Sequence, residues 1–266
     1  MDSLTVYWRL ISAQIRGQMQ YRVSFLLQLL GSFSTVFAEL LAVLILFRTF
    51  GEMAGWRVGE VALLYSLVAI GFGLSELVSE GFDDMSVLIR MGDFDRILTR
   101  PIPAFVQVMS SQFALRRLGR IAHGVVALTL SHWWLRLAWS WVDVLLFLLA
   151  LAGTAVVFFS IVLIGAAICF WTTERTEVQN VFTYGGTELV SYPMHIYNRW
   201  LRSVFLWVVP LGLTTYYPVL HILQKTDPLG MPGWLPFVGP LIAPLFFGVA
   251  LLIWRTGMDH YQSTGS

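Results

Sequence analysis

The stretch Met91-Gly-Asp-Phe-Asp-Arg-Ile-Leu-Thr-Arg-Pro101 separates two long apolar segments and carries four charges in eleven residues. Pro101 and Pro103 follow these charges, and a proline lacks a backbone N–H and restricts the residue before it. We therefore expect a helix to end near Arg100. A charged stretch of this kind is either a solvated loop that joins two spans or an ordered element at a membrane surface.

The composition predicts a polytopic membrane protein. Hydrophobic residues make up 57% of the chain and charged residues 12%, against roughly half and a quarter in soluble domains, and the mean hydropathy is +0.70. The net charge of +1 provides no strong field to attract nucleic acid. The single cysteine, Cys169, excludes an intramolecular disulfide and a multi-cysteine metal site. We expect no cleavable signal peptide, because no short apolar stretch directly follows a basic tip.

Residues 1–23 carry too many polar side chains for a span, but they fit an amphipathic helix. At about 100° per residue, Trp8, Ile11 and Ile15 fall within one arc, and Arg9 and Arg16 fall on the opposite side. Trp and Arg side chains beside an apolar face are typical of a helix that lies in the membrane interface. We predict such an interfacial helix; the alternative is a helix that packs on the cytoplasmic face of the protein.

A membrane-spanning helix needs roughly 20 apolar residues to cross a hydrocarbon core about 30 Å thick. The sequence predicts an all-α integral membrane protein with six such spans. They cover residues 24–47, 61–80, 118–138, 142–171, 203–223 and 237–254. Gly71 and Gly73 offer small surfaces for close packing of the second span, and Pro210 and Pro218 predict kinks in the fifth.

The distribution of Lys and Arg predicts the orientation, since these residues predominate in cytoplasmic segments. With both ends of the chain inside, 13 of them fall in inside segments and four in outside loops. The predicted topology is N-in and C-in, which puts residues 81–117 in the cytoplasm. Segment 172–202 is too polar for a span and ends as an interfacial element.

Three stretches resemble a known family. Gly92-x-Phe94-Asp95-x-x-Leu98-x-Arg100-Pro101 resembles the Gly-x-hydrophobic-Asp-x-x-Leu-x-Arg-Pro signature of a bacterial family of type-2 ABC exporter permeases. The other two stretches similar to this family are Tyr192-Pro193 with Tyr197 downstream, and Gly257-x-x-x-Tyr261-x-Ser263-x-Gly265-Ser266. The resemblance extends over nearly the whole chain in its length and in the spacing of its spans.

The resemblance implies a six-span permease subunit for efflux in the bacterial cytoplasmic (inner) membrane. Its partners would be membrane lipids, a second permease in a homodimer or a paralogous heterodimer, and separate cytoplasmic ABC ATPase subunits. Segment 81–117 would contain the cytoplasmic coupling helix between spans 2 and 3. The residues implied in coupling to the ATPase are Gly92, Phe94, Asp95, Leu98, Arg100 and Pro101.

On this interpretation the coupling helix carries apolar anchors and registering charges. Phe94 and Leu98 lie four residues apart, on one helical face, and we expect them to enter a groove on the ATPase. Asp95 and Arg100 would set the register of the contact. Alternatively, Asp95 pairs with Arg96 or Arg100 and only stiffens the turn.

The chain is not expected to be an enzyme or to bind a cofactor. A P-loop requires Gly-x-x-x-x-Gly-Lys-Ser/Thr, and no such motif surrounds Lys225, the only lysine. ATP and Mg²⁺ would therefore bind to the partner ATPase. The histidines lack metal-ligand spacing and no Gly-x-Ser-x-Gly is present. An intramembrane lipid-modifying enzyme and a secondary transporter are the alternative functions.

Two acidic residues, Glu39 and Glu76, are predicted to lie inside the first and second spans. An ionised side chain at that depth costs about 2.5–3.5 kcal/mol even on insertion scales, so each should face the bundle interior or water. In one interpretation both line the translocation path. In the other, each is a hydrogen-bonded lock between helices. The apolar lining does not identify the transported substrate.

Overall fold

The computed structural model describes residues 3–20, 51–174 and 177–262, with scattered positions between residues 23 and 45. These residues form helices and turns without a named β-strand, which confirms the predicted all-α class. The predicted first span, residues 24–47, lies mostly outside the described residues.

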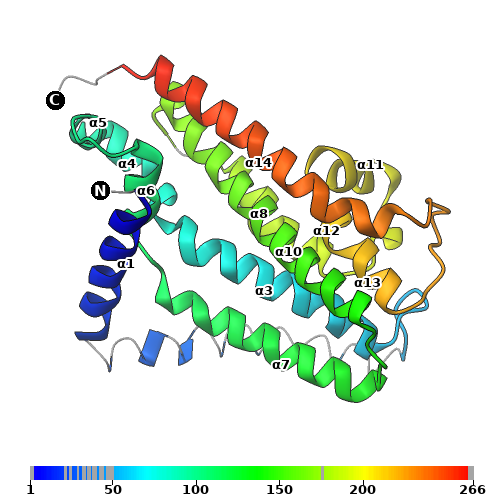
Figure 1. The fold of residues 1–266 in the computed structure, drawn as a ribbon. Helices are drawn as coiled ribbons and strands as arrows, with labels where there is room; N and C mark the ends of the chain where they lie inside the picture. The colour runs from blue at the N-terminus through cyan, green and yellow to red at the C-terminus, as the bar shows by residue number, and fades with distance from the viewer. Residues whose placement is uncertain are drawn as a thin grey trace.

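Four long helices lie side by side and form the body of the structure (Figure 1). α3 (Val58–Asp83) packs against α7 (Leu118–Leu135) and α8 (Trp141–Thr172), and α8 also packs along α14 (Leu235–His260). Figure 1 shows that α3, α8 and α14 run in one direction and α7 in the other.

Three described stretches are long and apolar enough to cross a membrane: Val58–Arg90, Trp141–Thr172 and Leu235–His260. They contain the predicted second, fourth and sixth spans. α7 coincides with the predicted third span but is not among the three, because Arg120, His123 and His132 lower its hydropathy. A fourth span is obtained only if a bent helix pair, described below, is counted as one crossing.

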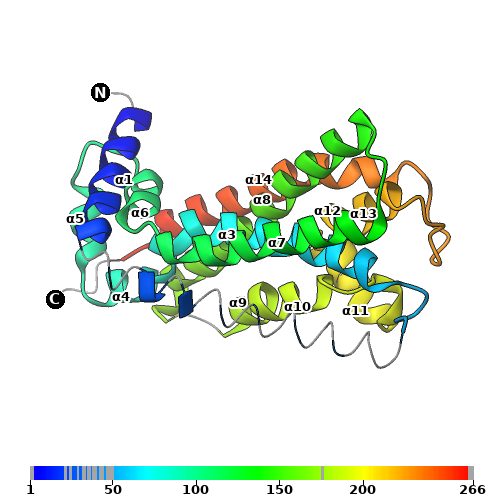
Figure 2. The ribbon, with the colours of Figure 1, turned by 90° about the horizontal axis from the view of Figure 1, so that it is seen from below.

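The two ends of the bundle carry different segments (Figures 1 and 2). One end, called here the α5 end, carries α4 (Met85–Arg90), α5 (Asp93–Leu98), α6 (Ala104–Ser111) and the C-terminal end of α14. The other end, called the α13 end, carries the loops around residues 51–57 and 223–234. Segment 81–117 and the C-terminal end of α14, both predicted to be cytoplasmic, therefore lie together, and the predicted outer loops lie opposite to them. The end of segment 172–202 was also predicted to lie on the cytoplasmic side, but it lies at the α13 end, where His195 Nε2 is 3.1 Å from the Ala54 carbonyl oxygen.

α1 (Ser3–Gln20) confirms the predicted N-terminal helix. It lies at the α5 end, across the direction of the long helices (Figure 1). Gln14 Nε2 donates a hydrogen bond to the Ser111 carbonyl at 2.7 Å, and Gln18 Nε2 donates to the Phe113 carbonyl at 2.6 Å. Ile11 is buried and Trp8 is 60% exposed. One side of α1 therefore packs on the protein while Trp8 points outward, an arrangement that suits an interfacial helix.

The predicted fifth span, residues 203–223, is not one straight helix. α11 (Arg199–Ser203) continues into a π-helical turn, η4 (Val204–Val208), and the chain then bends by 74° into α12 (Leu211–Thr214) and α13 (Tyr216–Ile222). The bend occurs at Pro210, as predicted, because proline cannot continue the hydrogen-bond ladder. Both limbs stay near the α13 end (Figure 1).

Segment 172–202 contains a helical run that its polar residues had concealed. α9 (Val178–Asn180), the π-helical turn η2 (Val181–Gly185) and α10 (Gly186–Val190) follow one another beside α3 and α8. The hydroxyls of Thr183, Thr187 and Ser191 donate to the carbonyls four residues earlier at 3.0, 2.8 and 2.7 Å. Because these buried groups bond to their own helix, they do not need water. The segment was predicted not to be a span, and α9, η2 and α10 are not among the candidate spans of the described residues; the buried helical run itself was not predicted.

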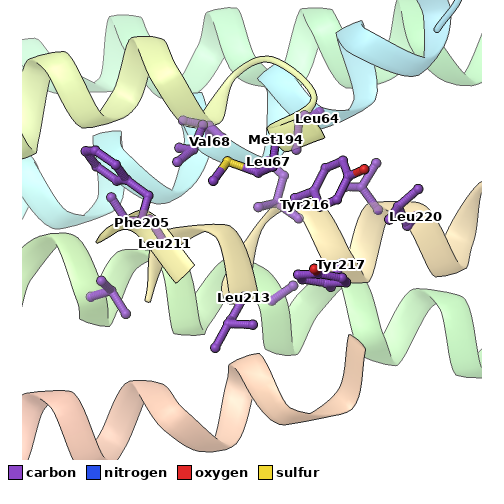
Figure 3. Packing of buried hydrophobic residues seen from close by; sticks show 14 of the residues in the cluster. Leu64, Leu67, Val68, Met194, Phe205, Leu211, Leu213, Tyr216, Tyr217 and Leu220 are labelled. Carbon is purple, nitrogen blue, oxygen red and sulfur yellow. The ribbon is translucent and has the colours of Figure 1, made fainter. Parts of the chain in front are cut away.

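Two clusters of buried apolar side chains hold the bundle at its two ends. The larger lies toward the α13 end, where Leu64 and Leu67 of α3 meet Tyr216 and Tyr217 of α13 (Figure 3). The smaller lies at the α5 end, and its buried members come from α3, α4, α5, α6, α8 and α14. The short helices of the α5 end therefore share a core with the long ones.

Small residues allow the long helices to approach closely, as predicted for α3. A Cβ on Gly71 would lie 2.7 Å from the Thr154 side chain of α8, and one on Gly73 would lie 2.8 Å from the Ile121 side chain of α7. At the end of α3, a Cβ on Gly81 would lie only 2.0 Å from the Val108 carbonyl oxygen of α6. That last contact is with backbone, which cannot rotate away.

We therefore expect Gly81→Ala to lower the thermal unfolding midpoint of the detergent-solubilised protein, because α6 must move away from α3. The matched control is Gly248→Ala in α14, where an added Cβ meets nothing within 4 Å. Alanine is favoured over glycine in a helix by about 1 kcal/mol, so the control should keep or raise the midpoint. Equal midpoints for the two variants would contradict the close α3–α6 contact.

Candidate functional site

Gly92 divides the signature stretch into two short helices. α4 ends before it, α5 begins after it, and its backbone has φ 70° and ψ 5°. This left-handed conformation is strained for a residue with a Cβ. α5 then ends at Leu98, close to the helix end expected near Arg100, and the chain turns through Pro101. Gly92 thus turns the chain between α4 and α5.

Phe94 is fully buried within this chain, with 0% of its surface exposed. Its ring meets Phe170 of α8 with centroids 5.1 Å apart and Tyr261 with centroids 5.0 Å apart, both edge to face. Phe170 also packs on Trp254 of α14 at 5.2 Å. We call Phe94, Phe170, Trp254 and Tyr261 the aromatic junction. It joins α5 to the ends of two long helices.

Asp95 adds a polar bond to this junction. The hydroxyl of Tyr261 donates a hydrogen bond to Asp95 Oδ1 at 2.9 Å. Burial raises the pKa of the Tyr261 phenol to about 12, and the hydrogen bond to Asp95 acts in the same direction. The phenol therefore stays protonated and remains a donor. Arg96, one of the alternative partners expected for Asp95, instead pairs with Asp93 at 3.3 Å.

The C-terminal motif therefore meets the signature stretch in space. Gly257 lies against Phe170, where a Cβ would approach the ring to 2.6 Å, so a glycine here lets α14 close on α8. Tyr261, four residues later, reaches Phe94 and Asp95. Ser263, Gly265 and Ser266 lie outside the described residues. The third motif does not join them: Tyr192 and Tyr197 flank η3 (Met194–Ile196) and pack on the larger cluster.

Leu98 lies one turn after Phe94 on the same helical face, but at the exposed end of α5. Its side chain is 50% exposed, and Met91 and Val87 are 65% and 42% exposed. Arg100 and Pro101 are exposed beside it. The expectation that Phe94 projects toward a partner together with Leu98 is wrong, because Phe94 fills the core of this chain. Of the two side chains, only Leu98 is available to a partner.

Gln107 holds the turn that follows α5, a role that the sequence did not reveal. Its Nε2 donates to the carbonyls of Ile97 at 2.8 Å and Ile102 at 2.7 Å. The side chain is buried in α6. These bonds fix residues 97–102 and with them the position of Leu98. The sequence feature that could have indicated this role is the single amide side chain, Gln107, inside the apolar run Ala104–Ser111.

Glu76 lies in a buried ion-pair network toward the α5 end of α3. Its Oε1 is 2.8 Å from Arg117 Nη1, and its Oε2 is 3.0 Å from Arg120 Nε. Tyr184 of η2 donates to Oε1 at 3.3 Å. Glu80, one turn further on, pairs with Arg116 and Arg117. These contacts join α3, α7 and η2, and they favour the lock over the path lining for Glu76. Glu39 lies outside the described residues.

Because a buried carboxylate holds two arginines here, Glu76→Leu should destabilise the protein by up to about 3–5 kcal/mol. Glu76→Gln should cost less, since the amide keeps hydrogen-bonding capacity. Thermal unfolding in detergent measures both. The control is Glu52→Leu, because the Glu52–Arg57 pair at 3.8 Å is exposed and such pairs contribute little. A Glu76→Leu variant with wild-type stability would contradict the lock.

Comparison with protein families places these features in a known group. The chain matches the family model described as ABC-2 family transporter protein over residues 33–265, which includes the signature stretch and the aromatic junction. No curated protein matches the chain. The match covers most of the sequence and agrees with the apolar helices and the membrane composition. The chain therefore belongs to the ABC-2 family of membrane transporter proteins.

Proposed function

We propose that the chain is the permease subunit of an ATP-driven exporter in the bacterial inner membrane. It forms the translocation path together with a second permease, as a homodimer or with a paralogue. Separate cytoplasmic ABC ATPase subunits bind ATP and Mg²⁺ and dock on α4 and α5. The family supports a membrane transport component; the ATPase, the dimer and the direction of transport are part of the proposal.

The contrast in burial along α5 carries this proposal. Within one six-residue helix, Phe94 is 0% exposed and Leu98, one turn later, is 50% exposed. Phe94 holds the ends of α8 and α14 through the aromatic junction. Leu98 lies at the exposed end of the helix. A helix that is anchored in the spans at one residue and exposed one turn later is suited to pass a partner's movement into the membrane helices.

The exposed end of α5 also indicates the chemistry of the partner surface. Leu98, Met91 and Val87 supply apolar contacts, and the exposed cations beside them are Arg90, Arg96 and Arg100. We expect the ATPase to offer an apolar groove with acidic residues at its rim. In such an interface a few apolar anchors carry most of the affinity, and rim charges mainly set the rate and orientation of docking.

Movement of α5 would reach the spans by two routes. Through Phe94 it passes to Phe170 and Tyr261, at the ends of α8 and α14. Through α6 and the following turn it passes to Arg116 and Arg117, which pair with Glu80 and Glu76 on α3. Because both routes consist of packed or paired groups, α3, α8 and α14 would shift together.

The alternative functions gain little support from the side chains. Among the described residues, no group of three or more His, Cys, Asp or Glu could hold a metal ion. His123 lies beside Tyr65, His221 packs on Phe237, and His195 lies between the Tyr216 hydroxyl and the Ala54 carbonyl. These dispersed contacts are those of structural histidines, so an intramembrane enzyme is the weaker proposal.

The proposal predicts that Leu98→Ala weakens binding of the ATPase encoded beside this chain. Truncating a buried interface anchor costs about 2–4 kcal/mol, so copurification should fall steeply. The matched control is Leu241→Ala in α14, an exposed leucine far from α5. It should leave the ATPase bound. Lys225→Ala is a poorer control, since Lys225 Nζ pairs with Glu60 at 2.6 Å.

Phe94→Ala should act differently from Leu98→Ala, because Phe94 does not reach the surface. It empties the aromatic junction and loosens α5 from the spans, so the ATPase stays associated but its hydrolysis no longer drives transport. Transport and ATP hydrolysis measured in proteoliposomes separate the two defects. If Leu98→Ala and Phe94→Ala both leave binding and transport intact, α5 is not the coupling element.

A further inference from the structure

An apolar groove lies beside the bend at Pro210. Its main recess has a volume of about 230 Å³. The main recess is lined by α8, the run from α9 to η2, the end of η4, and α14. The side chains that define it are Ile164 and Ile168 of α8, Phe182 of η2, Val208 and Val209, and Phe246 of α14.

The backbone explains why this recess exists. η4 stops at Val208 and the chain turns by 74° into α12, so η4 does not continue along α8, and no other helix of the described residues fills this recess. η2 and η4 are both π-helical turns, and such turns widen a helix locally and are frequent at functional sites. Gly165 lets Gln179 approach α8, since a Cβ there would lie 2.2 Å from Gln179 Oε1. Gln179 is the polar side chain in the wall of the recess.

The position of the groove indicates what surrounds it. Ile164 and Ile168 lie in the half of α8 that leads to the α5 end, and Phe246 lies near the middle of α14. Both helices are long and apolar enough to span the membrane. The groove therefore lies at the depth of the hydrocarbon core, in the half of the membrane that is nearer to the α5 end.

We propose that this groove binds one acyl chain of a membrane phospholipid from the leaflet on the α5 side. Water is a poor occupant, because a buried water needs two to four polar partners and the wall consists of apolar side chains apart from Gln179. A helix, with a diameter of about 10–12 Å, is too wide to enter. A hydrocarbon chain is thin and flexible, and it restores the dispersion contacts that an empty recess loses.

The chain would enter between Val178 and Val208, whose side chains are 59% and 64% exposed. Its methylene groups would lie along Ile164 and Ile168. The headgroup would stay at the level of Asn180 and Glu177, the polar residues next to Val178 at the start of this helical run. Lipid bound here would support the break at Pro210 from the side of the groove.

Photolabelling tests this site directly. The purified protein is placed in nanodiscs that contain a phosphatidylcholine with a diazirine in its acyl chain, irradiated, and digested for mass spectrometry. We expect adducts to be concentrated on Ile164, Ile168 and Phe182. The exposed leucines of α14, Leu241, Leu245 and Leu252, report ordinary contact with the bilayer. The yield of adducts on the groove residues should exceed the yield on these leucines several-fold.

A matched pair of substitutions makes the result specific. Val208→Trp fills the groove from its exposed rim and should remove most of the groove adducts. Val249→Trp makes the same change on the outward face of α14, where Val249 is 50% exposed, and should leave them unchanged. Thermal unfolding confirms that both variants are folded. Uniform labelling of groove and outward leucines, or groove adducts that persist in Val208→Trp, would overturn the proposal. ATP hydrolysis is not part of this assay, so its outcome is independent of the ATPase.

Discussion

The burial of Phe94 between Phe170 and Tyr261 is the contact on which the α5 end depends. A short helix of six residues is not stable alone, so α5 must be held by its surroundings. The aromatic junction supplies that support, with edge-to-face pairs at centroid distances of 5.0 and 5.1 Å. Each such pair contributes about 0.5–1.5 kcal/mol beyond the area it buries. The Tyr261–Asp95 hydrogen bond then fixes the rotation of α5 about its anchor.

This constraint divides the signature residues into two kinds. Gly92, Phe94 and Asp95 serve the fold of this chain, through a left-handed turn, a core ring and a hydrogen-bond acceptor. Leu98, Arg100 and Pro101 remain at the surface. The motif therefore combines residues that support α5 with residues that stay exposed, and the exposed ones are those to which the proposed ATPase contact is assigned.

The sequence predicted the class, the long helices and the bend at Pro210, because apolar length and proline chemistry are local properties. It failed where tertiary contacts decide. Segment 172–202 was predicted only to be no span, and its buried helical run was not predicted, because Thr183 and Thr187 bond within their own helix and so tolerate burial. Phe94 and Leu98 lie on the same helical face, but only Phe94 packs against α8, so one side chain is buried and the other is exposed. The partners of Glu76 were not foreseeable, as Arg117 lies in a short 3-10 turn (Leu115–Arg117) and Arg120 in α7, both far from Glu76 in the sequence.

The central claim is that α5 moves as one body with the C-terminal end of α14. Its most direct test is a distance measurement by pulsed electron paramagnetic resonance between spin labels at Arg96 and Asp259, both exposed. The labels are placed in a Cys169→Ser background, with the ATPase bound, in nucleotide-free and ATP-trapped states. The account predicts one unchanged distance distribution for this pair in both states. A distribution that shifts or broadens when ATP is trapped would contradict it.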